Sequence, residues 1–339
     1  MSAPPIRNAP SSVIVGAGQF TYTAHADWCD LPAGCEVTAV AADSQDRVYV
    51  FNRSERPVMV FAADGRFLES WGEGVFTGAH GIHVGPDDSI YCCDYLDHTV
   101  RKFTPQGELL LTLGTRGRPS DTGAATVDYR NIRQAAGPFS FPTNLAIASD
   151  GALYIADGYG NARIHKFSDA GEMLFSWGAP GDGPGEFRVP HGIAIARSGM
   201  VYVADRENSR IQRFTPDGRY VDEWRDVARP CEVFIDPAGL VFVAELGYRA
   251  GMFAGNEAPS PDATGGRVSV FSADGELLAR WGGGENPCAP GDFFAPHDIW
   301  VDSRGDLYVS EVAYTAGVRR GLIGLDCHTL QKFKRSSPA

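Results

Sequence analysis

Short runs of alternating apolar and polar residues recur along the whole chain and are separated by turns rich in Gly, Pro and Asp. In one stretch these runs cover residues 189–195, 201–206 and 210–214, and a last run ends at Trp224. Alternation with a period of two residues is typical of half-buried β-strands. No long window shows the apolar period of about 3.6 residues that an amphipathic helix requires. Each such stretch therefore predicts a meander of four antiparallel strands joined by tight turns.

This four-run block occurs six times, with a repeat of about 42 to 48 residues. The blocks cover residues 35–74, 79–117, 141–178, 189–228, 229–284 and 295–333. A four-stranded sheet cannot bury both faces alone, so we expect the blocks to stack and close into a ring. The predicted fold is all-β, a six-bladed β-propeller in which residues 1–339 form a single domain. The sixth block lacks a clear fourth strand, and we expect the run 12–16 to supply it and close the ring.

The composition narrows the classes of partner and compartment. Hydrophobic residues make up 43% of the chain and charged residues 21%, as in a globular protein with a substantial core. The formal net charge of −12 argues against a nucleic acid or an anionic membrane surface as partner. The apolar runs are strand-sized and the Pro-rich start has no signal-peptide core, so we expect neither a membrane span nor an export signal. Seven scattered cysteines are poor material for disulfides, and we expect a reducing, cytoplasmic location.

The register of the repeat identifies one position that lies eleven residues before the Tyr or Phe of each second strand. We call this position the tier. Around the ring the tier residues are Thr38, His80, Thr143, His191, Cys231 and His297. Histidine therefore occupies the tier in blades two, four and six only, about 120° apart around the axis. Three neutral imidazoles that converge at the start of the innermost strands suit a divalent metal such as Zn, Fe, Mn or Co. Cys231 is either a soft extra ligand or nucleophile, or simply a small residue beside the axis.

The end of each second strand returns to the face where the first strand begins, which we call the tier face. Fifteen or sixteen positions after the tier lie Arg53, Tyr95, Tyr159 and Arg206. Two arginines beside a metal suggest that a small carboxylate substrate is bound by bidentate hydrogen bonds. Tyr159 could act as a general base, and Tyr95 could contact substrate. Alternatively, Arg206 pairs with Asp205 or Glu207, and Tyr95 only packs.

Acidic residues recur just before these positions, at the end of the second strand. They are Asp94, Asp157, Asp205, Glu245 and Glu311. Recurrence in five blades favours a structural role in binding loop main chain. Asp298 departs from this pattern because it directly follows His297, and its carboxylate could bind a second, harder cation.

Three irregular stretches interrupt the repeat, at 118–140, 246–265 and 313–320. All belong to connections that emerge on the tier face. We expect them to wall a substrate pocket there, since loops on a rigid scaffold commonly carry binding sites.

At these positions the chain resembles the catalytic core of the peptidyl-α-hydroxyglycine α-amidating lyases, six-bladed propellers of the NHL-repeat type. The resemblance runs from about residue 27 to residue 333 and is most specific over 142–164, 189–212 and 296–299. It implies zinc ligands at His80, His191 and His297, a catalytic tyrosine at Tyr159, and active-site arginines at Arg53 and Arg206. It also implies a structural calcium site made by the Asp298 side chain and the main-chain carbonyls of Val40 and Ile82.

The resemblance further implies cleavage of the C–N bond of a carbinolamide to an amide and glyoxylate, with a metal favouring the alkoxide of the substrate hydroxyl. Secreted members of that family carry disulfide cysteines where this chain has Phe141, Gly160, Tyr202 and Arg213. Their absence agrees with a reducing compartment. The substrate could also be another α-hydroxy acid derivative or a small carbonyl compound, with the pocket loops setting the choice.

Three functions are therefore compatible with the sequence. The first is a metal-dependent lyase acting on a small carboxylate-bearing carbinolamide or a related α-hydroxy compound. The second is a hydrolase or hydratase that uses metal-bound hydroxide at the same site. The third is a non-enzymatic propeller that binds a partner. The sequence does not indicate an oligomeric state.

Overall fold

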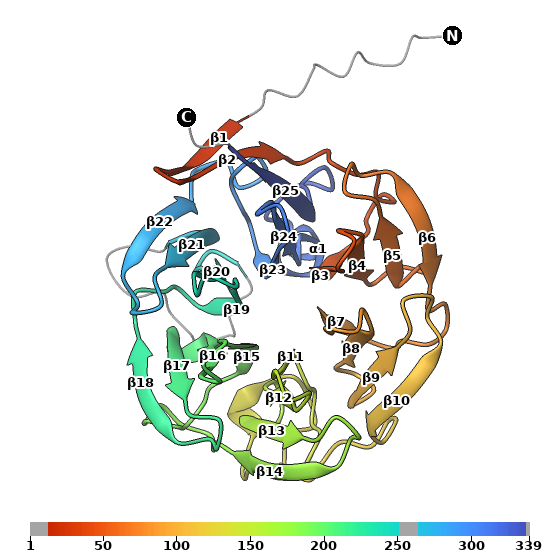
Figure 1. Cartoon of the computed structure of the whole chain (residues 1–339), viewed down its shortest axis with the longest axis vertical. Coiled ribbons are helices and arrows are strands. Elements are labelled where there is room, and N and C mark those ends of the chain that lie inside the picture. Colours follow the sequence, from red (N-terminus) through yellow and green to blue (C-terminus); the bar gives the residue numbers. More distant parts are fainter. Residues whose placement is uncertain (1–12, 251–263, 337–339) are drawn as a thin grey trace.

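The computed structural model describes residues 13–250 and 264–336. Six antiparallel sheets are arranged around a central axis like the blades of a propeller (Figure 1). Five sheets have four strands and the sixth has five. The predicted six-bladed all-β architecture is therefore confirmed.

The two inner strands of each blade are almost entirely buried. The innermost strands are β3 (Val37–Ala42), β7 (Ala79–Val84), β11 (Asn144–Ile147), β15 (Pro190–Ile195), β19 (Pro230–Ile235) and β23 (Pro296–Val301). The second strands are β4 (Val48–Asn52), β8 (Ile90–Asp94), β12 (Leu153–Asp157), β16 (Val201–Asp205), β20 (Val241–Glu245) and β24 (Leu307–Glu311). Every residue of the second strands is buried, because these strands have a neighbouring strand on each side and a neighbouring blade on each face.

The two outer strands complete each blade. The third strands are β5 (Val58–Phe61), β9 (Thr99–Phe103), β13 (Arg163–Phe167), β17 (Arg210–Phe214), β21 (Arg267–Phe271) and β25 (Leu330–Arg335). The fourth strands of blades one to five are β6 (Phe67–Trp71), β10 (Leu109–Gly114), β14 (Met173–Trp177), β18 (Tyr220–Trp224) and β22 (Leu277–Gly282). Short helices occur only in connections of the described chain, at η1 (Tyr129–Asn131), η2 (Arg206–Asn208), α1 (Ala313–Ala316) and η3 (Val318–Arg320).

The ring is closed by the N-terminal segment, but not by the run expected from the sequence. The fourth strand of blade six is β2 (Phe20–His25), which pairs antiparallel with β25. The preceding strand β1 (Val13–Ala17) pairs with β2 and adds a fifth, outer strand. Phe20, Tyr22 and Ala24 are buried in alternation. This two-residue period suits a strand with one face on the core, and it makes β2 rather than β1 the closing strand.

The core lies between the blades rather than at the centre. Six separate apolar clusters each join residues of two adjacent blades. Four of these clusters contain a tryptophan at or near the end of a fourth strand, which packs on a phenylalanine at or near the end of a third strand in the next blade. The pairs are Trp71–Phe103 (5.1 Å between ring centroids), Trp177–Phe214 (5.7 Å), Trp224–Phe271 (5.8 Å) and Trp281–Phe333 (5.8 Å). The Trp at the end of the repeat thus joins neighbouring blades.

The cysteines depart from the expectation drawn from their number. Cys288 and Cys327 form a disulfide between the loop before β23 and the loop before β25. The other five are free thiols, at Cys29, Cys35, Cys92, Cys93 and Cys231. The expectation of no disulfide is therefore wrong for one pair, because these two distant loops meet only in the folded blade six. Disulfides persist in oxidising compartments, so the cysteines no longer support a reducing one, and the cytoplasmic location stays a prediction.

In the described part of the chain, no helix has the length and hydropathy that a membrane span requires.

Candidate metal centre

Three histidines converge on the propeller axis, as the repeat register predicts. His80, His191 and His297 lie at the second positions of β7, β15 and β23. Their ring centroids are 4.7–4.8 Å apart in all three pairings, which makes a nearly equilateral triangle. Among the described residues, these three alone form a group of potential metal-ligand atoms, all within 4.8 Å of one another.

Each histidine is oriented by the main chain of the next blade. The Nδ1 atoms of the three rings lie 2.7–2.9 Å from the carbonyl oxygens of the tier residues Thr143, Cys231 and Thr38, respectively. A carbonyl can only accept, so each Nδ1 carries the proton and each Nε2 keeps a free lone pair toward the axis. The main-chain carbonyls of the tier residues in blades one, three and five therefore orient the tier histidines of blades two, four and six.

The electrostatics keep the three rings neutral. Burial holds the pKa of His80 and that of His191 well below the ordinary value, and nearby cationic groups lower both further. Burial lowers the pKa of His297 to about 3. Neutral imidazoles with inward lone pairs and no carboxylate among them match the three-histidine donor set of a catalytic zinc site. These residues therefore fit a divalent transition metal.

Glycines make the oriented carbonyls possible. Gly81 and Gly192 directly follow two of the histidines. A Cβ on Gly81 would lie 2.6 Å from the Thr143 carbonyl oxygen, and one on Gly192 would lie 2.5 Å from that of Cys231. Any larger residue would displace the carbonyl oxygen that orients the histidine ring. The orientation of His80 and His191 therefore depends on the glycine that follows each of them.

The Tyr159 hydroxyl lies against two of the three histidines. It lies 3.1 Å from Nε2 of His80 and 3.2 Å from Nε2 of His191. Arg206 donates to the same hydroxyl over 3.3 Å. The phenol is thus placed where a proton can be exchanged with a group bound in front of the histidines.

Arg206 combines two of the roles that the sequence left open. Its Nε donates to Glu207 over 2.9 Å, while its guanidinium carbon lies 5.2 Å from the centre of the Tyr159 ring. Glu207 also accepts from Arg229 over 2.7 Å. Arg206 therefore pairs with Glu207 rather than with Asp205, and still presents a buried cation to the three-histidine group.

Arg53 and Tyr95 lie together beside His80. Arg53 donates to Glu36 over 2.7 Å and to the carbonyl of Ala79 over 3.3 Å. Its guanidinium carbon lies 5.5 Å from the centre of the Tyr95 ring, which in turn lies edge-on to His80 at 5.7 Å. Tyr95 therefore packs on both Arg53 and His80.

A cavity of about 290 Å³ opens onto His297 of the histidine triangle. It is lined by Arg53, Tyr95, Tyr159 and Arg206, the four residues that the register predicts on the tier face. The three irregular stretches contribute Val127, Leu246, Thr315, Ala316 and Arg320 to its lining, and Val312, directly before the third stretch, also lines it. The expectation that these stretches wall a pocket on the tier face is confirmed at these positions. Residues 251–263 of the second stretch lie outside the described residues.

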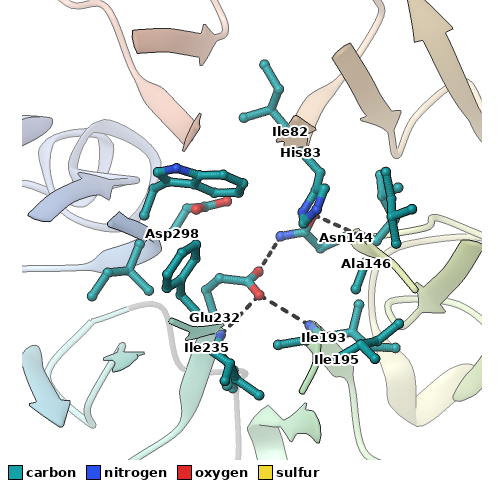
Figure 2. Close-up of a pocket in the computed structure, with 16 residues that line it drawn as sticks. Ile82, His83, Asn144, Ala146, Ile193, Ile195, Glu232, Ile235 and Asp298 are labelled. Atoms are coloured by element: carbon teal, nitrogen blue, oxygen red, sulfur yellow. Dashed lines mark hydrogen bonds between the residues drawn. The ribbon is translucent and has the colours of Figure 1, made fainter. Parts of the chain in front are cut away.

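Two of the three predicted calcium ligands, Asp298 and Ile82, line a second cavity of about 210 Å³ (Figure 2), whereas Val40 is not among its lining residues. Burial and the neighbouring Glu232 raise the pKa of Asp298 well above its ordinary value, and the main chain of Val40 hydrogen-bonds to its carboxyl. Burial raises the pKa of Glu232 to about 8. Ile82 lines the same cavity, and Asn144 donates to Glu232. No lysine or arginine is among the described residues that line this cavity, so its two carboxyl groups have no cationic side chain there.

The sequence interpretation missed Glu232 and Asn144. They occupy the position directly after the tier in blades five and three, which is the position of Asp298 in blade six. The same register would have found them.

Cys231 belongs to a buried apolar cluster that also contains Leu246 and Phe294. Its sulfur is not part of the group of ligand atoms. Burial raises the pKa of this thiol to about 11, which does not suit a nucleophile. What this residue contributes is the carbonyl that accepts from His191.

The recurring acids bind main chain at the entry to each blade. Asp94 accepts from the N–H of Gly78, Asp157 from that of Ser140 and Asp205 from that of Arg188, over 2.8–2.9 Å. Glu245 and Glu311 bind the N–H groups of Ala228 and Phe294 in the same way. The structural role predicted for these acids is confirmed.

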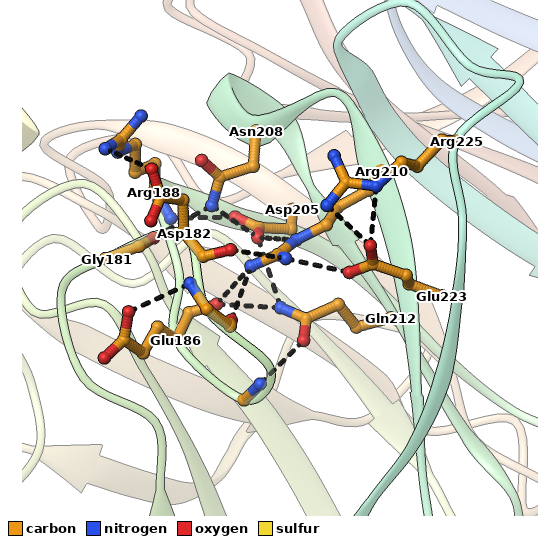
Figure 3. A network of polar contacts seen from close by, with 12 residues as sticks. Gly181, Asp182, Glu186, Arg188, Asp205, Asn208, Arg210, Gln212, Glu223 and Arg225 are labelled. Carbon is orange, nitrogen blue, oxygen red and sulfur yellow. Dashed lines mark hydrogen bonds and ion pairs between the residues drawn. The ribbon is translucent and has the colours of Figure 1, made fainter.

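In blade four, Asp205 also belongs to a larger network of polar contacts around Arg210 (Figure 3). Arg210 is 1% exposed and donates to Asp205 over 2.7 Å and to Glu223 over 2.8 Å. It also donates to the carbonyls of Asp182, Gly183 and Glu186 in the connection from blade three. One buried guanidinium therefore fixes the loop that leads into the His191 strand.

Comparison with known proteins agrees with this architecture. The NHL repeat family model matches residues 139–167 and 187–214. NHL repeat-containing protein 3 of Homo sapiens is 30% identical over 331 residues, which cover 91% of this chain and 87% of that protein. Peptidyl-alpha-hydroxyglycine alpha-amidating lyase 1 of Drosophila melanogaster is 34% identical over 119 residues, which cover 34% of this chain but only 19% of the lyase. A solved streptogramin B lyase superposes with a TM-score of 0.60 at 14% identity, over 93% of this chain and 98% of its own, which shows a shared fold.

Proposed function

The chain belongs to the NHL repeat family, and within that family we propose that it is a metal-dependent lyase that cleaves the C–N bond of a small, carboxylate-bearing carbinolamide. The observation that carries this proposal is the placement of Tyr159. Its hydroxyl faces two inward Nε2 atoms of a three-histidine centre and contacts the guanidinium of Arg206. A proton-transfer group, a metal-ligand set and a carboxylate-binding cation thus meet at the end of one cavity. Two of the relatives are named as peptidyl-alpha-hydroxyglycine alpha-amidating lyases, which supports a lyase.

The chain's own residues account for binding and proton movement. Arg53 and Arg206 line the cavity and are the groups that hold the substrate carboxylate. His80, His191 and His297 would hold zinc or another divalent metal, which would supply a Lewis acid to lower the pKa of the substrate hydroxyl. In the reaction the hydroxyl proton leaves, the C=O bond of an aldehyde forms, and the C–N bond breaks. The proton ends on the departing amide nitrogen, and the Tyr159 hydroxyl is the group placed to relay it.

We place a second cation, calcium, at the Asp298 carboxyl together with the main-chain carbonyls of Val40 and Ile82. Buried carboxyl oxygens in a cavity whose described lining includes no lysine or arginine suit a hard cation, and Glu232 contributes a further carboxyl. The Asp298→Asn variant should lose calcium while keeping the metal of the histidines. Retention of calcium in that variant would contradict this placement.

The test of the lyase proposal is turnover of a panel of N-acyl hydroxyglycines and related α-hydroxy acids by the metal-loaded protein. We expect equal amounts of glyoxylate and amide. In water labelled with heavy oxygen the amide should carry no label, because C–N scission requires no water. Label in the acyl product would instead establish the hydrolase, and no turnover of any panel member would contradict both enzymes.

A further inference from the structure

Glu36 is a buried carboxylate that joins two walls of the proposed substrate cavity. It precedes β3 in blade one and is 3% exposed. It accepts from Nη1 of Arg53 over 2.7 Å and from the hydroxyl of Thr315, in blade six, also over 2.7 Å. Its other oxygen accepts from the main-chain N–H of Thr315. The sequence patterns described above gave this residue no role.

The contacts with Thr315 anchor α1. Thr315 is the third residue of this four-residue helix, and the N–H groups of a first helical turn have no partner within the helix. Glu36 supplies that partner from another blade, with a charge that is favourable at a helix start. Since Thr315 and Ala316 line the cavity, Glu36 fixes part of the wall.

The contact with Arg53 anchors the cation. The main-chain N–H of Arg53 donates to the Glu36 carbonyl over 3.0 Å, and the side chain contacts Glu36 and, at 3.4 Å, the Thr315 hydroxyl. The Arg53 side chain is 25% exposed, whereas the Glu36 side chain is 4% exposed. A long arginine on a rim loses much rotamer freedom when it binds a ligand, and a buried partner that holds it beforehand removes that loss.

We propose that Glu36 is a positioning residue that sets the guanidinium of Arg53 and the α1 wall in one geometry for a substrate carboxylate. This inference rests on the proposed function, because it assumes that Arg53 holds the carboxylate. Glu36 touches neither the histidines nor the Tyr159 hydroxyl in any described contact, so it acts on substrate binding rather than on the bond-breaking step.

The test variant is Glu36→Asp, which keeps the charge and shortens the reach by one methylene. The long-range attraction of the pocket for an anion is then unchanged, and only the positioning is lost. We expect the affinity of the zinc-loaded protein for glyoxylate, measured by calorimetry, to fall about tenfold. For a turned-over hydroxy acid, KM should rise while kcat stays within about twofold. Glu55→Asp is the matched control, since Glu55 is exposed and has no described contact with Arg53, and it should bind as the parent does.

A double-mutant cycle separates positioning from a general effect on folding. In an Arg53→Ala background, Glu36→Asp should change glyoxylate affinity by less than about twofold, because the two residues act as a unit. An additive loss would contradict the inference. If Glu36→Asp does not fold, Thr315→Val removes the hydroxyl contact with both partners and should weaken binding about threefold; an unchanged affinity would again contradict it.

The outcomes distinguish the two proposals. If wild-type protein binds glyoxylate and Glu36→Asp binds it equally well, the role of Glu36 is wrong and the proposed function stands. If metal-loaded wild-type protein binds no glyoxylate, the proposed function is wrong and the inference falls with it.

Discussion

Two sets of residues surround the same face of the propeller, and they differ in how they recur. The acids that end the second strands are present in five blades, and each binds main chain at the entry to its own blade. The tier holds histidine in alternate blades only, and those three side chains meet on the axis. A residue that recurs in most repeats serves what those blades share, which is a fixed loop. A residue that breaks the repeat serves a single site that only the closed ring creates.

The difference predicts that changes at the centre and changes in the acids will have separable effects. The largest effect is expected for Tyr159→Phe, which removes one hydroxyl at the centre. Turnover should fall about 10²–10⁴-fold, the range of a lost proton-transfer group, with the metal content and melting temperature unchanged. Tyr95→Phe is the control and should lose less than about tenfold. Equal effects of the two substitutions would remove the distinction that we draw between the tyrosines.

The converse effect is expected for Asp205→Ala, in the blade-four network. This change leaves the Arg210 guanidinium buried without its nearest carboxylate. The free energy of unfolding, measured by denaturant titration, should fall by about 3–5 kcal/mol. The folded variant should still bind the metal, because none of the three histidines contacts Asp205. A variant with wild-type stability and no metal would reverse the roles that we assign to the two sets.

A more gradual effect, spread over several pH units, is expected in the metal-free protein. The tier histidines are neutral when folded, with pKa values held below 6.5 by burial, and that of His297 is about 3. The unfolded chain takes up protons below its histidine pKa of about 6.5 while the folded chain does not. The free energy of unfolding should therefore fall as pH decreases from about 6.5 toward about 3, by up to about 1.4 kcal/mol per pH unit for each histidine. In His297→Asn the slope should be shallower, and an identical slope would show that this ring does not titrate as the structure indicates.

The smallest effect concerns blade six alone. Under denaturing, non-reducing conditions a thiol reagent should label five cysteines, because Cys288 and Cys327 are joined. Labelling of seven in freshly isolated protein would instead support the reducing compartment expected from the sequence.

The sequence predicted most of the fold and much of the centre, because both depend on the repeat. Six alternating blocks predict six blades, and the register alone places the three histidines in one plane. The closing strand was misplaced because the alternation of Phe20, Tyr22 and Ala24 lies outside the repeat frame. The disulfide and Glu36 were missed because each depends on loops of distant sequence that meet in space. Such contacts have no period along the chain, and only the three-dimensional arrangement reveals them.

The central claim is that the histidines at the tier of alternate blades together bind one metal ion. Elemental analysis tests this claim most directly. Wild-type protein, His191→Ala and His83→Ala should be purified and reconstituted side by side, since His83 is a histidine of β7 outside the tier. We predict about one transition metal per chain in wild type and in His83→Ala, and its loss in His191→Ala. Absence of bound metal in reconstituted wild-type protein, or full retention in His191→Ala, would contradict the account.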